Sequence, residues 1–186
     1  MQDPISPSQG RSVSIERGAA LSENPLLFRS SDPIPFSTIL PEHIEPAIEF
    51  LLRESHEALE RIVFHSKPRT FANTVEALDR VEIPLDRAWH VVTHLAKVDR
   101  SEELQALVCK LSPKVSHFYS EVRRGDGVWN ALVDFSRTSE AKRLSGNQKR
   151  LFDLMMDTCR RFGAELSPDK RAELLGCDSE IARLQR

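Results

Sequence analysis

From about residue 41 to the end of the chain, apolar side chains recur every three or four positions. A helix turns once in 3.6 residues, so this spacing places them on one helix face. No stretch alternates apolar and polar residues as a half-buried strand would, and only 7 of the 186 residues are glycine. The sequence therefore predicts an all-α fold, an irregular bundle of long, partly kinked helices. The first stripe consists of Ile44, Ile48, Leu51, Leu52, Leu59, Ile62 and Val63.

Two further long helices are predicted in the middle of the chain. The first has a capping-box pattern, with Asn73 as the cap and Glu76 three residues later, and Pro84 should kink it. The second begins after Ser101 as the cap and keeps its apolar phase through Pro113, which indicates one kinked helix rather than two. Their stripes are Val75, Leu78, Val81, Leu85, Ala88, Val92 and Leu95, then Leu104, Leu107, Leu111, Val115, Phe118 and Val122.

Three shorter helices follow. One comes after Gly125 and Gly127, the next covers about residues 147–162 with Gly163 just past its end, and the last begins at Ser167. The expected inward residues are, in order, Trp129, Leu132, Val133 and Phe135; Leu151, Leu154, Met155 and Phe162; and Leu174, Cys177, Ile181 and Leu184. The last stripe is still in phase near Arg186, which fits either a docked terminal helix or the front part of a longer protein.

The first residues have a different texture. Residues 1–23 carry Pro4, Pro7, Gly10, Gly18 and five serines without apolar periodicity, which predicts a disordered tail before a helical domain at 24–186. No secretory h-region is present, and Asp3 and Glu16 weigh against an organelle transit peptide. We expect deletion of the tail to leave the melting temperature unchanged within about 1–2 °C.

Composition excludes several function classes. Lys and Arg number 26 and Asp and Glu 28, so bulk charge argues against a polybasic nucleic-acid binder. Residues 137–186 carry a mild excess of basic residues, but no aromatic residues are interleaved with them for base stacking. No stretch approaches the roughly 18 apolar residues of a membrane span. Three widely spaced cysteines form neither a disulfide scaffold nor a CxxC site, which favours a reducing, cytoplasmic location.

The one pattern with ligand spacing is His90-Val-Val-Thr-His94. Two histidines four residues apart on a helix can bind a divalent metal. In the metallopeptidase motif H-E-x-x-H, however, a glutamate follows the first histidine and acts as the general base, whereas Val91 stands here. Arg87 and Lys97 share the expected face and would repel a cation, and no third ligand is evident. We therefore interpret the pair as polar surface residues.

Nothing else in the sequence singles out a reactive group. Gly-rich phosphate loops and a G-x-S-x-G nucleophile motif are absent. His43, His56, His65 and His117 stand alone and are expected to be surface or packing residues, and Cys109, Cys159 and Cys177 to be buried structural thiols. The sequence predicts no catalytic, cofactor-binding or metal-binding residue in this chain.

The segment from Asn24 onward resembles the start of the thimet oligopeptidase, neurolysin and oligopeptidase A family of zinc metallopeptidases. The resemblance rests on Asn24-Pro25-Leu26-Leu27, Pro35-Phe36, Ile39-Leu40-Pro41-Glu42-His43-Ile44 and Pro46-Ala47-Ile48. Thr93-His94-Leu95, Asn147-Gln148-Lys149 and residues 163–171 are similar to later family helices, less sharply. The resemblance covers about residues 24–186, which correspond to roughly the first quarter of a family member.

That resemblance implies a helical lobe that walls a channel admitting short peptides. The zinc motif of the family lies in a part that this sequence does not contain, so it assigns no catalytic residue here, and zinc is expected only in that absent catalytic domain. The expected partner is the remainder of the peptidase, or a partner helix surface; short peptides would bind only to the full enzyme, and neither nucleic acid nor a membrane is expected. The alternative is a non-enzymatic helical interaction module derived from that lobe.

Overall fold

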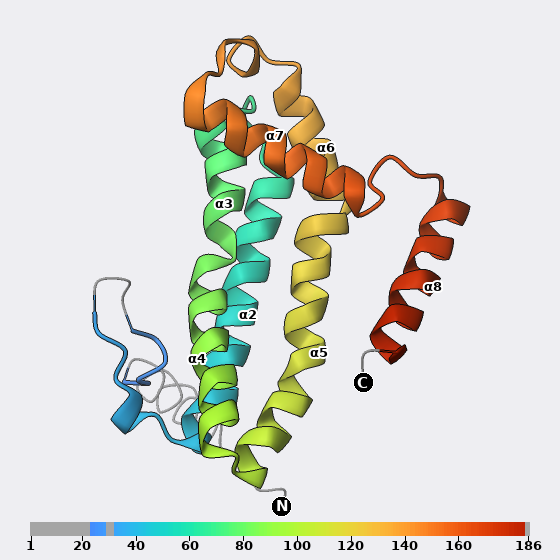
Figure 1. The fold of residues 1–186 in the computed structure, drawn as a ribbon. Coiled ribbons are helices and arrows are strands. Elements are labelled where there is room, and N and C mark those ends of the chain that lie inside the picture. The colour runs from blue at the N-terminus through green and yellow to red at the C-terminus, as the bar shows by residue number, and fades with distance from the viewer. Residues whose placement is uncertain (1–22, 29–31, 185–186) are drawn as a thin grey trace, which may run out of the picture. The chain divides into compact units, whose positions relative to one another are not determined.

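The computed structural model describes residues 23–28 and 32–184, and these form helices and connecting loops without a strand (Figure 1). The predicted all-α fold is confirmed. The predicted tail at residues 1–23 lies outside the described residues except for Glu23. The chain divides into two compact units: unit 1 is residues up to Ser55 with Ile83–Val115, and unit 2 is His56–Glu82 with Ser116–Arg186. No helix among the described residues is both long enough and apolar enough to cross a membrane.

Unit 1 is built on the first part of α2 (Pro41–Val63), on α4 (Ile83–Asp99) and on the first part of α5 (Glu102–Arg124), preceded by the 3₁₀ turn η1 (Phe36–Thr38). Within this unit, α4 runs antiparallel to α2 and α5 runs parallel to it (Figure 1). The core comes from the predicted stripes, so these faces were predicted correctly. Its buried residues include Ile44, Ile48, Leu51, Leu85, Ala88, Val92, Leu104, Leu111 and Val115.

Unit 2 contains the ends of α2 and α5 and six further helical elements. Its core includes a group of aromatic rings: the Phe135 ring lies edge-on to the rings of Phe152 at 5.3 Å and Phe71 at 6.4 Å between centroids. Gly127 allows a close approach, because a Cβ there would lie 2.5 Å from a methyl carbon of Val63. The elements are η2 (Phe71–Glu76, a π-helical segment), α3 (Ala77–Val81), α6 (Asp126–Ser136), η3 (Ala141–Arg143), α7 (Gly146–Arg161) and α8 (Pro168–Leu184).

The predicted cap at Asn73 was wrong by three residues. Thr70 is the N-cap: its hydroxyl accepts the backbone N–H of Asn73 at 3.1 Å, and Asn73 Oδ1 accepts the backbone N–H of Thr70 at 2.9 Å. This reciprocal pair is a capping box with an asparagine in place of the usual Glu or Gln. The segment that follows is π-helical, a geometry that apolar periodicity does not reveal.

The two internal prolines differ in effect. Pro84 was expected to kink one helix, but the helix ends at Val81 and a new one begins at Ile83, so Pro84 occupies a first turn where its missing N–H costs little. Pro113 lies inside α5, which continues through it as one helix, as predicted. The start of α5 is also confirmed, since Ser101 Oγ accepts the backbone N–H of Leu104 at 3.2 Å.

The predicted inward face of α7 was wrong. Leu154 is 61% exposed and Leu151 and Met155 are half-buried, whereas Phe152, Met156 and Cys159 are buried. Both sets fit a helical period, and periodicity alone does not say which of two apolar faces meets the core. The packing of Phe152 against Phe135 decides it.

The last helix begins at Pro168, one residue after the predicted start at Ser167. It follows Gly163, whose φ of +91° is a left-handed conformation suited to glycine at a helix end. Leu174 is half-buried, and its Cδ2 would lie 3.1 Å from a Cβ on Gly163. Cys177, expected on the inward stripe, is exposed. The side chains of Ile181 and Leu184, which the prediction also placed on that stripe, lie outside the described residues.

Candidate functional site

The histidine pair of α4 flanks a buried residue. Val91 is only 4% exposed, whereas the His90 and His94 side chains are exposed. His90 Nδ1 lies 3.8 Å from Asp86 Oδ2, a long contact between two largely exposed groups. Val91 stands where H-E-x-x-H has its glutamate, and its side chain is packed in the core and offers no base there.

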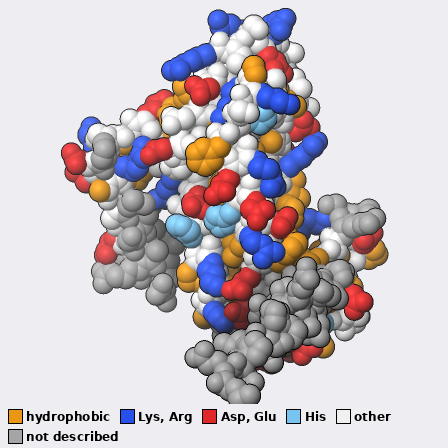
Figure 2. Space-filling view, turned by 180° about the vertical axis from the view of Figure 1, so that it is seen from behind, with side chains coloured by type: hydrophobic (Ala, Val, Ile, Leu, Met, Phe, Trp, Pro, Cys, Tyr) orange, Lys and Arg blue, Asp and Glu red, His pale blue; other side chains and the backbone are white. Residues whose placement is uncertain are grey.

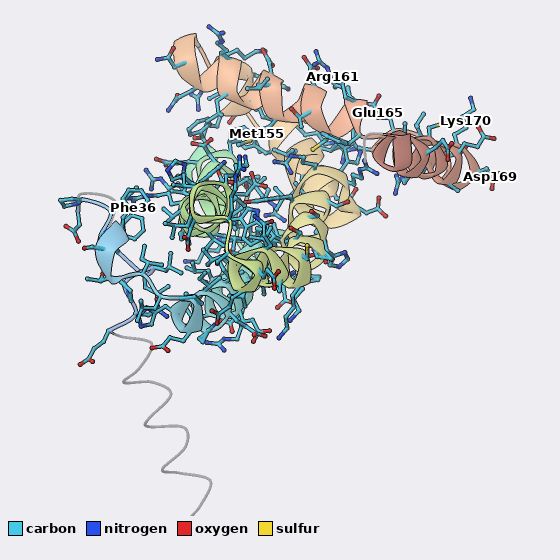
Figure 3. All side chains as sticks on the ribbon, turned by 60° about the horizontal axis from the view of Figure 1, so that its bottom comes forward. Phe36, Met155, Arg161, Glu165, Asp169 and Lys170 are labelled. Carbon is cyan, nitrogen blue, oxygen red and sulfur yellow. The ribbon has the colours of Figure 1, made fainter. Side chains whose placement is uncertain are left out.

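His94 has a different neighbour. Its ring lies 6.0 Å from the ring of Phe36, the η1 residue labelled in Figure 3. The Arg87 guanidinium, expected on the same helix face, lies 4.8 Å from the centre of the Phe28 ring. In the part of the chain that the structure describes, no three His, Cys, Asp or Glu side chains lie close enough to hold a metal. The residues present do not fit a zinc centre.

The remaining histidines make structural contacts. His56 Nε2 of α2 lies 2.8 Å from Glu121 Oε2 of α5, and His117 Nε2 lies 3.7 Å from the other oxygen of that carboxylate. His56 also meets the Phe118 ring edge-on at 4.9 Å. The Nδ1 atom of His65 accepts the backbone N–H of Lys67 at 3.0 Å. His56 thus links α2 to α5, His117 contacts the same carboxylate within α5, and His65 stabilises the turn that follows α2.

The cysteine prediction holds at one of three positions. Cys159 is buried, and burial raises the pKa of its thiol. Cys109 and Cys177 are exposed, contrary to expectation. Apolar neighbours at helical spacing made them look like core residues, but a helix also carries such positions at the edge of its buried face.

The residues that carry the family resemblance meet in space. Asn24 Nδ2 donates to the backbone carbonyl of His43 at 2.9 Å, and Asn24 Oδ1 accepts the backbone N–H of Leu26 at 3.0 Å. His43 Nδ1 in turn accepts the backbone N–H of Leu40 at 3.1 Å. Asn24 is buried although it is polar. The two motifs thus join the start of the described chain to the first turn of α2, a role that sequence reasoning did not foresee.

Unit 1 carries a wide groove of about 860 Å³ between the first turns of α2 and α5. Its walls bear two interhelical ion pairs, Glu45–Lys110 and Glu49–Lys114, each 2.6 Å between nitrogen and oxygen. Charged groups of both signs also alternate elsewhere on the surface (Figure 2). Even in the basic stretch of α7, Lys149 pairs with Asp153 and Arg160 pairs with Asp157.

Unit 2 carries a smaller groove of about 180 Å³, and most of the residues that line it are apolar. One wall is the outer face of α7, including Leu151, Leu154 and Met155, and the others come from α3, α5 and α6. Figure 3 labels Met155 on α7. The lining also includes the polar residues Asp79, Glu82, Arg123, Thr158 and Cys159.

The residues that the structure describes form an all-helical domain, and no group of three metal-ligating side chains lies together among them. Residues 48–171 match the family model described as the N-terminal domain of neurolysin and thimet oligopeptidase. The match takes in most of the chain, so the chain belongs to this family, as the sequence resemblance predicted.

Individual relatives agree with that assignment. Oligopeptidase A of Escherichia coli K12 is 32% identical over 148 residues, which are 80% of this chain and 22% of that protein. A probable cytosolic oligopeptidase A of Arabidopsis thaliana is 27% identical over 164 residues, 88% of this chain and 23% of that protein. An organellar, chloroplastic and mitochondrial oligopeptidase A of the same plant is 26% identical over 171 residues, which are 92% of this chain and 21% of that protein. The chain spans about a fifth of the length of these relatives.

Proposed function

We propose that this chain acts as the N-terminal, channel-wall part of a zinc-dependent oligopeptidase that hydrolyses short peptides, and that the catalytic zinc domain is not contained in it. The proposal rests chiefly on one observation, the family match over 48–171, which lies within the N-terminal domain. The sequence supports it further, because it contains no H-E-x-x-H and its His90-His94 pair encloses a buried valine. We place the protein in the cytoplasm, because one of its Arabidopsis thaliana relatives is described as a probable cytosolic oligopeptidase A.

The first experiment assays the isolated chain. Supplied with zinc, it should not cleave short quenched fluorescent peptides, because no base stands beside the histidine pair. His90→Ala and His94→Ala variants serve as controls and should behave as the parent chain does. Cleavage that a chelator stops and that His90→Ala removes would overturn this interpretation of the pair.

The second experiment tests the positive part of the proposal. Residues 24–186 replace the aligned segment of E. coli oligopeptidase A, and the chimera is assayed on the same peptides. Cleavage by a folded, zinc-loaded chimera supports the channel-wall role. A chimera that folds and binds zinc but cleaves nothing contradicts it.

A non-enzymatic interaction module remains the second candidate. The observation that favours it is the exposed apolar groove of unit 2, which suits a partner segment as well as it suits the rest of an enzyme. A reading frame that stops directly after Arg186 would support the module, and a frame that continues into an H-E-x-x-H would support the peptidase.

A further inference from the structure

Helix α7 has two apolar faces. Phe152, Met156 and Cys159 are buried in the core of unit 2. A second row, Leu151, Leu154, Met155 and Thr158, lies on another side and follows the i, i+3, i+4, i+7 spacing of a helix stripe. Surface helices of globular proteins usually carry one apolar stripe, and helices that are apolar on more than one side are covered on more than one side.

The described residues cover the second row only in part. Leu154 is 61% exposed, and Leu151 and Met155 are half-buried. Together with neighbouring elements the row forms the groove of about 180 Å³. The rest of its lining is Leu78, Asp79 and Glu82 near α3, Val122 and Arg123 of α5, Val128 and Leu132 of α6, and Cys159.

Most residues that line the groove are apolar, and its three charged residues, Asp79, Glu82 and Arg123, include both signs. Arg123 Nη2 lies 3.5 Å from Glu82 Oε1, so these two charges offset each other. The volume is below the roughly 300–1,000 Å³ of small-molecule sites, and few polar groups converge on it. A groove bordered by an apolar helix face with this spacing can receive a partner helix by its apolar stripe.

We propose that this groove receives the apolar face of a helix from the remaining length of an oligopeptidase polypeptide. The inference rests on the proposed function. Relatives are several times longer than this chain, since the matched part is only 21–23% of their lengths. All groove residues lie within the family-matched range 48–171, so a member of ordinary length carries the same elements beside much additional chain.

The test measures whether Leu154 becomes covered. A Leu154→Cys variant is made in the isolated chain and in the E. coli chimera, and alkylation of that cysteine is followed by mass spectrometry. We expect fast labelling in the isolated chain and slow labelling in the chimera. Phe64→Cys is the matched control, because Phe64 also belongs to unit 2, is 80% exposed and lies outside the groove. It should label fast in both.

A charge at the same position gives a second measurement. Leu154→Glu should change the melting temperature of the isolated chain by no more than about 1–2 °C, since the residue is exposed. In the chimera it should lower the melting temperature by several degrees, because a carboxylate would be buried without a partner. Phe64→Glu should have a small effect in both proteins.

The outcomes separate the two proposals. An active chimera in which Leu154→Cys labels fast overturns the groove inference and leaves the proposed function standing. A folded, inactive chimera in which Leu154→Cys labels slowly supports the groove inference and contradicts the proposed function. An isolated chain that dimerises, and becomes monomeric with Leu154→Glu, shows that a second copy occupies the groove and also overturns the inference. Should the chimera not fold, the E. coli protein without its aligned segment is added in trans, and lack of binding or of protection counts against the inference.

Discussion

The two units are held together by different chemistry. In unit 1, the surface contacts between α2 and α5 are ion pairs, Glu45–Lys110 and Glu49–Lys114, above a core of aliphatic side chains. In unit 2, the contacts between elements include edge-on aromatic contacts centred on Phe135 and its ring neighbours. Exposed ion pairs contribute little to stability, whereas buried aromatic rings contribute much. Substitutions at the exposed ion pairs should therefore lower the free energy of unfolding much less than substitutions at the buried rings.

The surface grooves of the two units also differ, in their size and in the residues that line them. The groove of unit 1 is the larger and has many charged residues in its lining, and the groove of unit 2 is smaller and is lined mostly by apolar residues. Charges on a groove wall remain hydrated when the groove is empty, so an open groove costs unit 1 little. An apolar groove keeps hydrophobic surface in water and gains free energy when it is covered. This contrast is why the inferred docking surface lies in unit 2.

The largest expected effect is at the aromatic centre of unit 2. Phe135→Ala removes a fully buried ring and should lower the free energy of unfolding by about 3–5 kcal/mol, from lost burial and the cavity left behind. Urea denaturation followed by circular dichroism measures it. Phe64→Ala, at an 80% exposed position of the same unit, is the control and should change stability by less than about 0.5 kcal/mol. Equal effects would mean that the aromatic cluster does not hold unit 2 together.

The next effect concerns unit 1. Asn24→Ala removes both hydrogen bonds of the buried amide and leaves the N–H of Leu26 without its side-chain acceptor, which should cost about 1–3 kcal/mol. Asn24→Asp keeps an acceptor for Leu26 but loses the donor to His43, so its effect should be intermediate. Hydrogen exchange of residues 24–28 reports the loosening. Unchanged protection in Asn24→Ala would show that the motif is not the anchor of this segment.

A smaller effect is expected at the start of η2. Thr70→Ala removes the hydroxyl that caps Asn73 and should lower the free energy of unfolding by about 1 kcal/mol. Thr70→Ser retains the hydroxyl and should behave nearly as the parent does. Thermal unfolding of the three proteins checks this, and a Ser variant as unstable as the Ala variant would point to lost packing of the methyl group instead.

The smallest effect concerns an ion pair of unit 1. Glu49 accepts a hydrogen bond from Lys114 Nζ and attracts its charge, which raises the pKa of that lysine. The pair's contribution is therefore fully present below the ordinary lysine pKa and is lost as pH rises through the higher folded value. Glu49→Gln should lower the pKa of Lys114, as a carbon-detected NMR titration would show. Glu54→Gln, at an exposed position on the same helix, should leave it where it is.

Some of these features could be predicted from the sequence, and others could not. The stripe of α2 and the cap at Ser101 follow from local rules, because helical period and hydrogen bonding within one turn are properties of neighbouring residues. The capping box at Thr70 was not predicted, because an asparagine takes the place usually held by Glu or Gln, and Asn73 was itself interpreted as the cap. The helix break before Ile83 was not predicted, because a proline at this position fits both a kinked helix and the first turn of a new one.

The sequence was enough to predict the family, the all-α fold and the lack of a glutamate between His90 and His94. Each of these depends on residue types at fixed spacing. Only the tertiary structure decided that Asn24 binds the His43 carbonyl and that α7 turns Phe152 inward and leaves Leu154 in a groove. A residue does not carry in its local sequence the identity of the distant surface that it meets. When a helix has two apolar faces, the choice between them is made by shape and contact with other elements.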